Sequence, residues 1–546
     1  MPPTAVDTGY TSPLDECPND GDNEDELTRM DHYYNGSIEL LFDFKPKHVP
    51  GGWDSLVRLV SQLSRLQDLL WACETQFPPC LLHILDHNLR RCKLHIRAFK
   101  MPSLHQDADH PSDVDERDFA LATSPCLSSV LVPLSHYDTD GCVEYNEEAV
   151  LRMAAGMTPN LTHVHIVHRP IGSSPYFHNA VIRGRPPWRG FFINDHQEGK
   201  FEASQQVHLQ CWSLSPAQFD YFETWEKHIA FSDLRTLHLW EATFDTLELA
   251  RRHQFESLKI LALDLEYTDD QREGPTQDDE LLLDEAASKF LSAIASPLES
   301  MHLSGVPHAT QTFQAILDQH GKSLHTLSLI TPGGNSLAGP QMSTSRIKQI
   351  KAQCPNIRDL RLPIRRTSGD ANEIKIYQAF GEFPYLTDLS LELQLTDGTP
   401  ESRTFSAGDD KNARDIFMSI AVDEVLAREI FTKITNAGAR SLQRFKLTVN
   451  SETAPIELEP IAHVMKRQWK CIRFPGGEDG NAEARDINVV AREIGAKKRV
   501  LLDKLDEEEY HPTRLGLYER VFRELWPART DSWKQDWHSF PLESND

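Results

Sequence analysis

Apolar residues recur along the chain in one short pattern, leucine-x-x-leucine-x-leucine, in which another apolar residue sometimes replaces leucine. Clear copies begin at Leu161, Leu234, Leu258, Leu298, Leu324, Ile357, Leu386 and Leu442, and looser copies begin at Leu89 and Leu127. The end of each copy alternates apolar and polar residues, which is the period of a β-strand. One copy could arise by chance or from a helix face, but so many copies indicate an internal repeat.

A helical pattern precedes most copies of this motif, and a short breaker separates the helix from the strand. The expected helices are Glu147–Ala155, Pro216–Ala230, Asp284–Ala295, Thr310–His320, Ser343–Gln353, Ile374–Phe380 and Asp423–Thr435. The breakers include Pro159-Asn160, Gly321-Lys322 and Pro355-Asn356. A helix, a turn and a short strand in repetition form the unit of a leucine-rich repeat, which buries its apolar face only by stacking on its neighbours.

The repeats are irregularly spaced, with wide gaps at 161–234 and 386–442 that hold either degenerate repeats or insertions. Stretches rich in Asp, Glu, Gly, Ser and Pro predict loops or disorder, because they bury too little apolar surface to offset chain entropy. These stretches cover residues 1–34, 104–118, 266–280, 397–412 and 475–487. We therefore expect a disordered acidic segment over 1–34 and a repeat array with insertions over 35–450.

The C-terminal part, residues 451–546, is expected to form a helical extension. Its helical patterns cover Val489–Leu505 and Arg514–Trp526. We expect Trp526, Trp533 and Trp537 to fold back and cap the array, since the exposed end of a solenoid needs covering. The expected fold is an α/β, irregular leucine-rich-repeat solenoid with short parallel strands on its concave face, helices outside and a C-terminal helical cap.

Composition and charge narrow the classes of function. The chain has 546 residues, too many for one ordinary core, whereas a repeat array has no such limit. Its formal net charge of −26 repels phosphate backbones, so we expect no nucleic-acid partner. The nine cysteines form no C-x-x-C pair, which favours reduced thiols and a cytoplasmic or nuclear location. No stretch has the length of an apolar membrane span, so we expect no membrane partner.

Three local patterns suggest chemistry, and an ordinary structural role explains each of them. His163 and His165 share a strand face in a geometry that zinc tolerates, but a polar strand face accounts for both. Gly321-Lys-Ser ends like a phosphate-binding loop, yet Ile316 stands where that loop needs its first glycine. The segment Gly334–Gly339 lacks the spacing of a nucleophile elbow. We therefore expect no catalytic residue, no bound metal and no cofactor.

The polar positions inside the strands predict a protein-binding surface. The position between the last two apolar residues of the motif carries His165, His238, His302, Arg361 and Lys446 in five of the eight clear copies, and Ala or Ser in the other three. In a leucine-rich repeat these positions face the concave side, so a protein partner is expected there; the alternative is an ordinary solvated sheet face. Arg358, Arg365 and Arg366 accompany Arg361 in sequence, a positive cluster that would attract an acidic or phosphorylated peptide.

The repeat region resembles the irregular leucine-rich-repeat arrays of fungal F-box proteins. The resemblance is carried by Leu66-Gln-Asp-Leu-Leu-Trp-Ala-Cys73 followed by Gln76-Phe-Pro-Pro79, by Pro187-Trp-Arg-Gly-Phe-Phe192, and by the repeats over 284–395. It covers about residues 55–450. Residues 1–50 show an acidic stretch and the strand-like Ile38–Phe44, so we expect any F-box to lie upstream of Met1 or to be absent.

The resemblance implies a function as well as a fold. F-box proteins of this class dock on a cullin–RING ubiquitin ligase through the Skp adaptor and hold the target on their repeats. The expected function is thus a non-catalytic substrate-recognition subunit, with the target on the concave face and Skp and cullin subunits as further partners. The alternative is a leucine-rich-repeat scaffold with no ubiquitin link, and an enzyme of unknown type is a more distant reading.

Overall fold

The computed structural model divides into two compact units, which are described separately. Unit 1 comprises residues 1–262 with 294–296, and unit 2 comprises residues 263–293 with 297–546. The residues that the structure describes are 52–73, 75–135, 138, 141–168, 186–191, 206–217, 219–266, 277–305, 310–330, 342–366, 369–394, 410–450, 459–474, 488–496 and 515–542. The segment 1–34 and Ile38–Phe44, for which disorder and a strand were expected, lie outside these residues.

The fold is mixed α/β, with a long and mostly parallel sheet. Fourteen strands among the described residues belong to this sheet, in chain order. Unit 1 contributes β1 (Asp68–Trp71), β2 (Lys93–Ile96), β4 (Leu127–Ser135), β6 (His163–His168), β7 (Cys211–Ser215) and β8 (Thr236–Ala242), all parallel to their neighbours in this series. Strand β9 (Ile260–Leu265) contains the division between the units.

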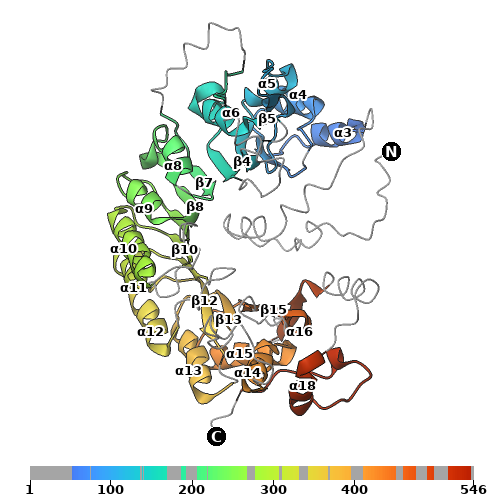
Figure 1. Ribbon diagram of the computed structural model, residues 1–546, viewed down its shortest axis with the longest axis vertical. Helices are drawn as coiled ribbons and strands as arrows, with labels where there is room; N and C mark the ends of the chain where they lie inside the picture. Colours follow the sequence, from blue (N-terminus) through green and yellow to red (C-terminus); the bar gives the residue numbers. More distant parts are fainter. Residues whose placement is uncertain are drawn as a thin grey trace, which may run out of the picture. The chain divides into compact units, whose positions relative to one another are not determined.

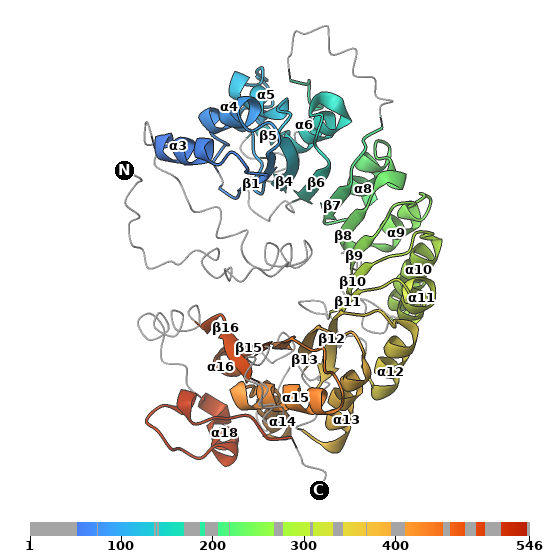
Figure 2. The ribbon, with the colours of Figure 1, turned by 180° about the vertical axis from the view of Figure 1, so that it is seen from behind.

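Unit 2 continues with parallel strands and ends with two antiparallel ones. The parallel series is β10 (Ser300–Ser304), β11 (Thr326–Leu329), β12 (Asp359–Arg365), β13 (Asp388–Gln394) and β14 (Arg444–Asn450). Strands β15 (Gln468–Phe474) and β16 (Asn488–Ile494) then pair antiparallel, β15 on β14 and β16 on β15. Figure 2 shows β12, β13, β15 and β16 within this unit.

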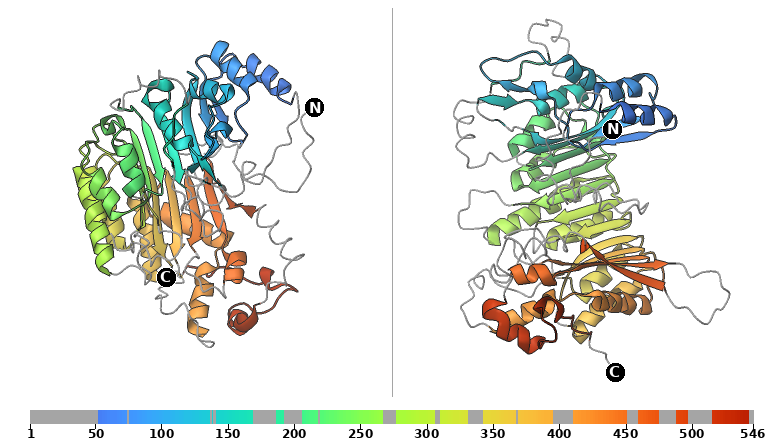
Figure 3. Two further views of the ribbon diagram at one scale, coloured as in Figure 1. Left: turned by 45° about the horizontal axis from the view of Figure 1, so that its top comes forward. Right: turned by 90° about the vertical axis from the view of Figure 1, so that its right-hand side faces the viewer.

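Helices connect the strands and lie along one side of the sheet in each unit (Figures 1 and 3). Unit 1 has α3 (Asp54–Gln62), α4 (Pro79–His87), α5 (Glu116–Ala122), α6 (Asn146–Arg152), α8 (Phe219–Glu226) and α9 (Phe244–Ala250). Unit 2 has α10 (Gln277–Ala293), α11 (Thr310–Ala315), α12 (Thr344–Gln353), α13 (Ala371–Ala379), α14 (Asp410–Ile420), α15 (Glu424–Asn436), α16 (Glu459–Met465) and α18 (Glu519–Leu525). Helices and strands therefore alternate over most of the described chain.

Local sequence explains where several helices begin. The side chain of Asp370 accepts hydrogen bonds from the backbone N–H groups of Asn372 and Glu373 at the start of α13. Asp423 caps α15 in the same way. Such side chains satisfy backbone donors that have no partner within the helix. Each of the seven helices expected before copies of the motif is present, and each copy of the leucine motif forms a strand.

The motif leucines form the core between the sheet and the helices. Leu327 of β11 lies in register with Met301 of β10 and Leu360 of β12, and all three side chains are buried. Parallel strands lie about 4.8 Å apart, so equivalent leucines of successive strands stack in rows. Through this stacking, each repeat completes the apolar core of the next repeat.

We expect Leu327→Ala to destabilise the protein by about 2–5 kcal/mol, because it leaves a cavity in this row. The measurement is chemical or thermal denaturation of the purified variant beside the wild type. The control is Leu281→Ala on α10, whose residue is 52% exposed and should matter little. A Leu327→Ala protein that melts with the wild type would contradict the stacking of these leucines.

The two wide gaps in the motif spacing have different contents. The gap at 161–234 holds a degenerate repeat, because Leu209-Gln-Cys-Trp-Ser-Leu214 forms strand β7 with Trp212 in place of a leucine. Trp212 is fully buried, so it fills the same core position with a larger ring. In the gap at 386–442, no further strand occurs in the part that the structure describes, and α14 and α15 occupy it. The second gap is therefore an insertion.

Two expectations about secondary structure are wrong. Residues 104–118 were expected as a loop, but they contain β3 (His105–Asp107), which pairs with β5 (Cys142–Glu144). Val489–Leu505 was expected as a helix, but its first residues lie in strand β16. Val489, Val490 and Ile494 are β-branched and pair well on a pleated surface, which outweighs the helical pattern. Residues 497–505, the remainder of that expected helix, lie outside the described residues.

The C-terminal segment packs back onto unit 2 through its tryptophans. Trp526 and Trp537 are buried in an apolar cluster with Phe417 of α14 and Met465 of α16, and Trp533 packs against that cluster. The segment is also held by polar contacts, since Ser539 N–H donates to Asp423 over 2.9 Å. The tryptophans thus fold back as expected, although strands β15 and β16 precede them in a part expected to be helical.

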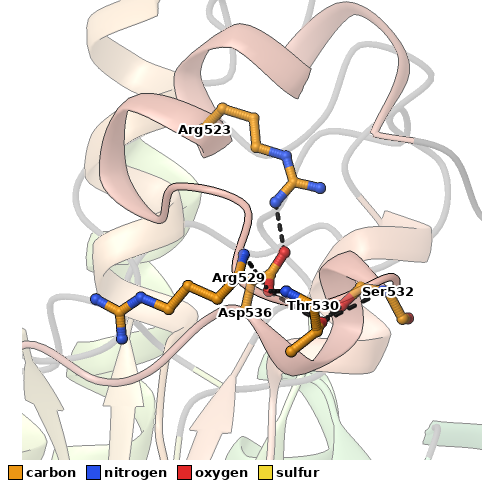
Figure 4. Close-up of polar contacts among 5 residues, drawn as sticks. All are labelled: Arg523, Arg529, Thr530, Ser532 and Asp536. Atoms are coloured by element: carbon orange, nitrogen blue, oxygen red, sulfur yellow. Dashed lines mark hydrogen bonds and ion pairs between the residues drawn. The ribbon is translucent and has the colours of Figure 1, made fainter.

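Asp536 organises the turn at the end of this segment (Figure 4). One carboxylate oxygen accepts a hydrogen bond from Arg523 Nη1 over 2.5 Å, and the other accepts from the backbone N–H groups of Arg529 and Thr530 over 3.0 and 2.9 Å. The Arg523 hydrogen bond is the main reason that the pKa of Asp536 falls from 3.8 to about 2. The folded protein therefore favours the ionised carboxylate.

We expect Asp536→Asn to lower the melting temperature at neutral pH and to lose this effect in acid. A carboxylate with a lowered folded pKa stabilises the protein above its unfolded pKa and stops doing so as the pH falls through the folded value. The difference between variant and wild type should therefore narrow between pH 3.8 and about 2. Melting curves at several pH values test this, with the exposed Asp531→Asn as control. A pH-independent difference would contradict the assignment.

Candidate functional site: the polar face of the sheet

The strand positions that alternate with the buried leucines form the polar face of the sheet in each unit. On β12 of unit 2, Leu360 and Leu362 are buried, whereas Asp359 and Arg361 between them are half-buried. The register runs from His302 of β10 through Ser328 to Arg361. It continues through Ser390 to Lys446. The equivalence of His302, Arg361 and Lys446 that was predicted from the motif is therefore confirmed within unit 2.

In unit 1 the polar face is a row of histidines and serines. His165 of β6 lies in register with Ser213 of β7, and Ser213 with His238 of β8. The exposed fractions of His165 and His238 are both 0%, and that of His302 in unit 2 is 6%. The alternative interpretation, an ordinary solvated sheet face, is therefore wrong for these three residues. The rings of His165 and His238 come from the two strands that flank β7 and contribute to the burial, with 6.3 Å between their centroids.

Burial also sets the charge of His165. Removal from water lowers the pKa of His165 well below 6.5, and the positive Arg97 nearby lowers it further. Neither ring nitrogen of His165 has a hydrogen-bond partner within the described ranges. This histidine is therefore neutral at pH 7, and it offers neither surface nor charge to a partner. We therefore exclude His165 and His238 from the candidate contact surface.

The arginine cluster expected around Arg361 forms only in part. Arg366 is fully buried at the end of the strand, where its Nη2 donates to the carbonyl of Phe540 over 3.4 Å. Arg358 precedes the strand and is exposed, whereas Arg361 and Arg365 lie two and six residues beyond Asp359 on the polar face. Alternate residues of a strand share a face, so Arg361 and Arg365 remain on one surface, and Arg366 does not join them.

Two basic residues of the same surface were missed in the sequence. Lys470 of β15 lies opposite Lys446, and Arg492 of β16 lies opposite Lys470. The signal was the alternation in Gln468-Trp-Lys-Cys471, where Trp469 and Cys471 are buried and Lys470 is half-buried. Two residues earlier on these strands, Asp388 of β13 accepts a hydrogen bond from Arg444 of β14 on the same face.

A buried acid–histidine–serine group in unit 1 does not have the arrangement of a catalytic triad. Ser135 Oγ donates to Glu147 over 2.5 Å and Trp225 Nε1 donates to the same carboxylate over 2.6 Å. His168 Nε2 lies 3.5 Å from Glu147, and its ring stacks on Tyr221. Activation of a serine nucleophile requires that its hydroxyl donate to a histidine base. Here the serine donates to the acid instead. The group is suited to holding α6 and α8 against the sheet.

The other motifs with possible chemistry also have structural explanations. Gly321 allows a close approach of chains, since a Cβ there would lie 2.8 Å from the carbonyl oxygen of Gln353. Gly334–Gly339 lies outside the described residues. Among the residues that are described, no group of three or more His, Cys, Asp or Glu could hold a metal ion, and no helix is long and apolar enough to span a membrane.

Comparison with known proteins adds no assignment. No model of a known protein family matches the chain, and the curated proteins include no match to its sequence. Function must therefore be argued from the sheet and its two faces.

Proposed function

We propose that this chain is a non-catalytic leucine-rich-repeat protein that recognises a protein partner through the polar face of its sheet. The observation that carries the proposal is the register of the motif strands. It stacks the leucines on one face and aligns polar residues on the other, as in Leu360 beside Arg361. A surface made of short strands in series is suited to an extended protein ligand, because each strand adds side chains at a fixed spacing.

We further propose that the partner is a target for ubiquitination and that the chain serves as substrate-recognition subunit of a cullin–RING ligase. The support is the resemblance of the repeat region to fungal F-box proteins. This role needs a surface that selects a partner and no reactive centre, in keeping with the polar contacts of Ser135, Glu147 and Trp225 described above. It also places the protein in the cytoplasm or nucleus, where these ligases act.

The experiment is affinity purification of the tagged full-length chain from cells that express it, followed by mass spectrometry. Under the proposal, Skp and cullin subunits co-purify with the chain together with at least one further protein. Recovery of partners without Skp or cullin subunits would favour a repeat scaffold with no ubiquitin link. Recovery of no protein partner above an untagged control would contradict the binding function itself.

A further inference from the structure

One row of the polar face in unit 2 carries a basic residue on four of five neighbouring strands and no acidic residue. It starts at Arg361 of β12, passes Ser390 of β13 and reaches Lys446 of β14. The antiparallel pairs then add Lys470 of β15 and Arg492 of β16. We call Arg361, Lys446, Lys470 and Arg492 the basic row. With about 4.8 Å between strands, the row extends over about 19 Å across five neighbouring strands.

The basic row lies on the more accessible face of these strands. Arg361, Lys446 and Lys470 alternate along their strands with buried residues, such as Leu447 of β14 and Trp469 of β15. Arg492 lies between the half-buried Ala491 and Glu493 of β16. Arg361, Lys446 and Lys470 are half-buried, and Arg492 is exposed. Half-buried cations on a sheet are screened less by salt than fully exposed ones, and their long stems can still present the charge to a ligand.

The balance of charge on this face opposes that of the whole chain. On β12–β16 the polar face carries Arg361, Arg365, Arg444, Lys446, Lys470 and Arg492 against Asp359, Asp388 and Glu392. Six basic and three acidic residues give a local net charge of +3, whereas the chain as a whole carries −26. All three acids lie outside the basic row. A positive strip on an acidic protein attracts acidic ligands and repels others.

The members of the basic row already interact within the protein. Arg361, Lys446 and Lys470 each have further contacts in the chain. One row away, Arg444 is paired with Asp388. A ligand would therefore add to these contacts or exchange with them. Exposed ion pairs contribute about 0–1 kcal/mol each, so exchange has a small cost and binding requires several contacts together.

We propose that the basic row binds an acidic segment of the protein partner, one that carries several carboxylates along an extended chain. Alternate residues of an extended segment lie about 7 Å apart, so successive carboxylates can reach different cations of the row. A single phosphate would need arginines that converge on one point, and the row spreads its charges over five strands instead. This inference rests on the proposed function and specifies the chemistry of its partner.

The test measures binding of a fluorescently labelled Glu-Ser repeat peptide to the purified full chain by anisotropy. We expect saturable binding that weakens as salt is raised. Lys446→Glu combined with Lys470→Glu should weaken it at least about tenfold, because two attractions become repulsions. The matched control, Lys289→Glu with Lys375→Glu, makes the same charge change on exposed positions of α10 and α13 and should change binding less than twofold. Circular dichroism must show that both double variants are folded. If the Lys446→Glu, Lys470→Glu protein does not fold, Lys446→Gln combined with Lys470→Gln takes its place.

Three results would overturn the inference. They are no binding of the Glu-Ser peptide by the wild type, equal losses in the two double variants, or tighter binding of a Ser-repeat peptide with one phosphoserine or of a single-stranded oligonucleotide. Failure here is separable from failure of the proposed function. If the peptide does not bind but Skp and cullin subunits still co-purify, only the role of the basic row is rejected. If the peptide binds but Skp and cullin subunits do not co-purify, only the ligase role is rejected.

Discussion

Replacing Trp526 by alanine is expected to destabilise the protein by about 3–5 kcal/mol, the range for a large aromatic removed from a core. Trp526 is 1% exposed. Its ring centroid lies 5.0 Å from that of Phe522 and 5.5 Å from that of Phe540, and its Nε1 donates to the carbonyl of His538 over 3.0 Å. The substitution therefore removes aromatic contacts and leaves the carbonyl of His538 without this donor.

Denaturation of the Trp526→Ala protein measures this cost, with Phe474→Ala as control because Phe474 is 44% exposed. The loss should also loosen the C-terminal segment, so the tail beyond Leu515 should be cleaved sooner by a protease. An unchanged melting temperature would mean that the segment does not depend on this cluster. A less stable protein whose tail is not cleaved faster would show that Trp526 stabilises unit 2 without holding the C-terminal segment in place.

The repeating part of the fold could be predicted because the spacing of the leucines both defines the motif and determines the packing of the core. The same leucines that define the motif also fill the core, as Leu327 and Leu360 do, so the pattern and the packing carry the same information. Strand β7 was not predicted because Trp212 replaces a leucine of the motif. Strands β15 and β16 were missed because neither carries the leucine motif, and the β-branched Val489 and Val490 were outweighed by their helical neighbours.

The candidate surface was predicted less well, for a physical reason. Motif alignment tells which strand positions are equivalent, and this part was correct for His302, Arg361 and Lys446. Exposure depends on what covers a face, which no local pattern encodes, and so the burial of His165 and His238 was not foreseen. The register of β14 with β15 decides that Lys470 joins Lys446, and this pairing involves residues far apart in sequence.

The two polar faces therefore differ in what they can do. In unit 1 the row is buried and His165 is neutral, which suits a role in holding neighbouring strands together. In unit 2 the row is more accessible on β12 to β16 and carries lysine and arginine side chains. Recognition through such a row should depend strongly on salt.

Gly305 offers the sharpest test of how the strands of unit 2 approach one another. It follows β10 with a φ of +114°, a conformation that side chains with a Cβ rarely adopt. A Cβ at this position would lie 2.0 Å from the carbonyl oxygen of Leu265 and 2.6 Å from its backbone nitrogen. Both are backbone atoms of β9, so no side-chain rotation can relieve the overlap.

Gly305→Ala should therefore destabilise the protein by about 3–5 kcal/mol, of which the left-handed conformation accounts for about 1–2 and the overlap for the remainder. The matched control is Gly495→Ala, because Gly495 has a φ of +72° and open space around it. That variant should show the conformational cost alone. Chemical denaturation of both variants beside the wild type separates the two contributions. Equal losses would show that the backbone of β9 can move away from Gly305, and the close packing of β9 and the end of β10 would then be wrong.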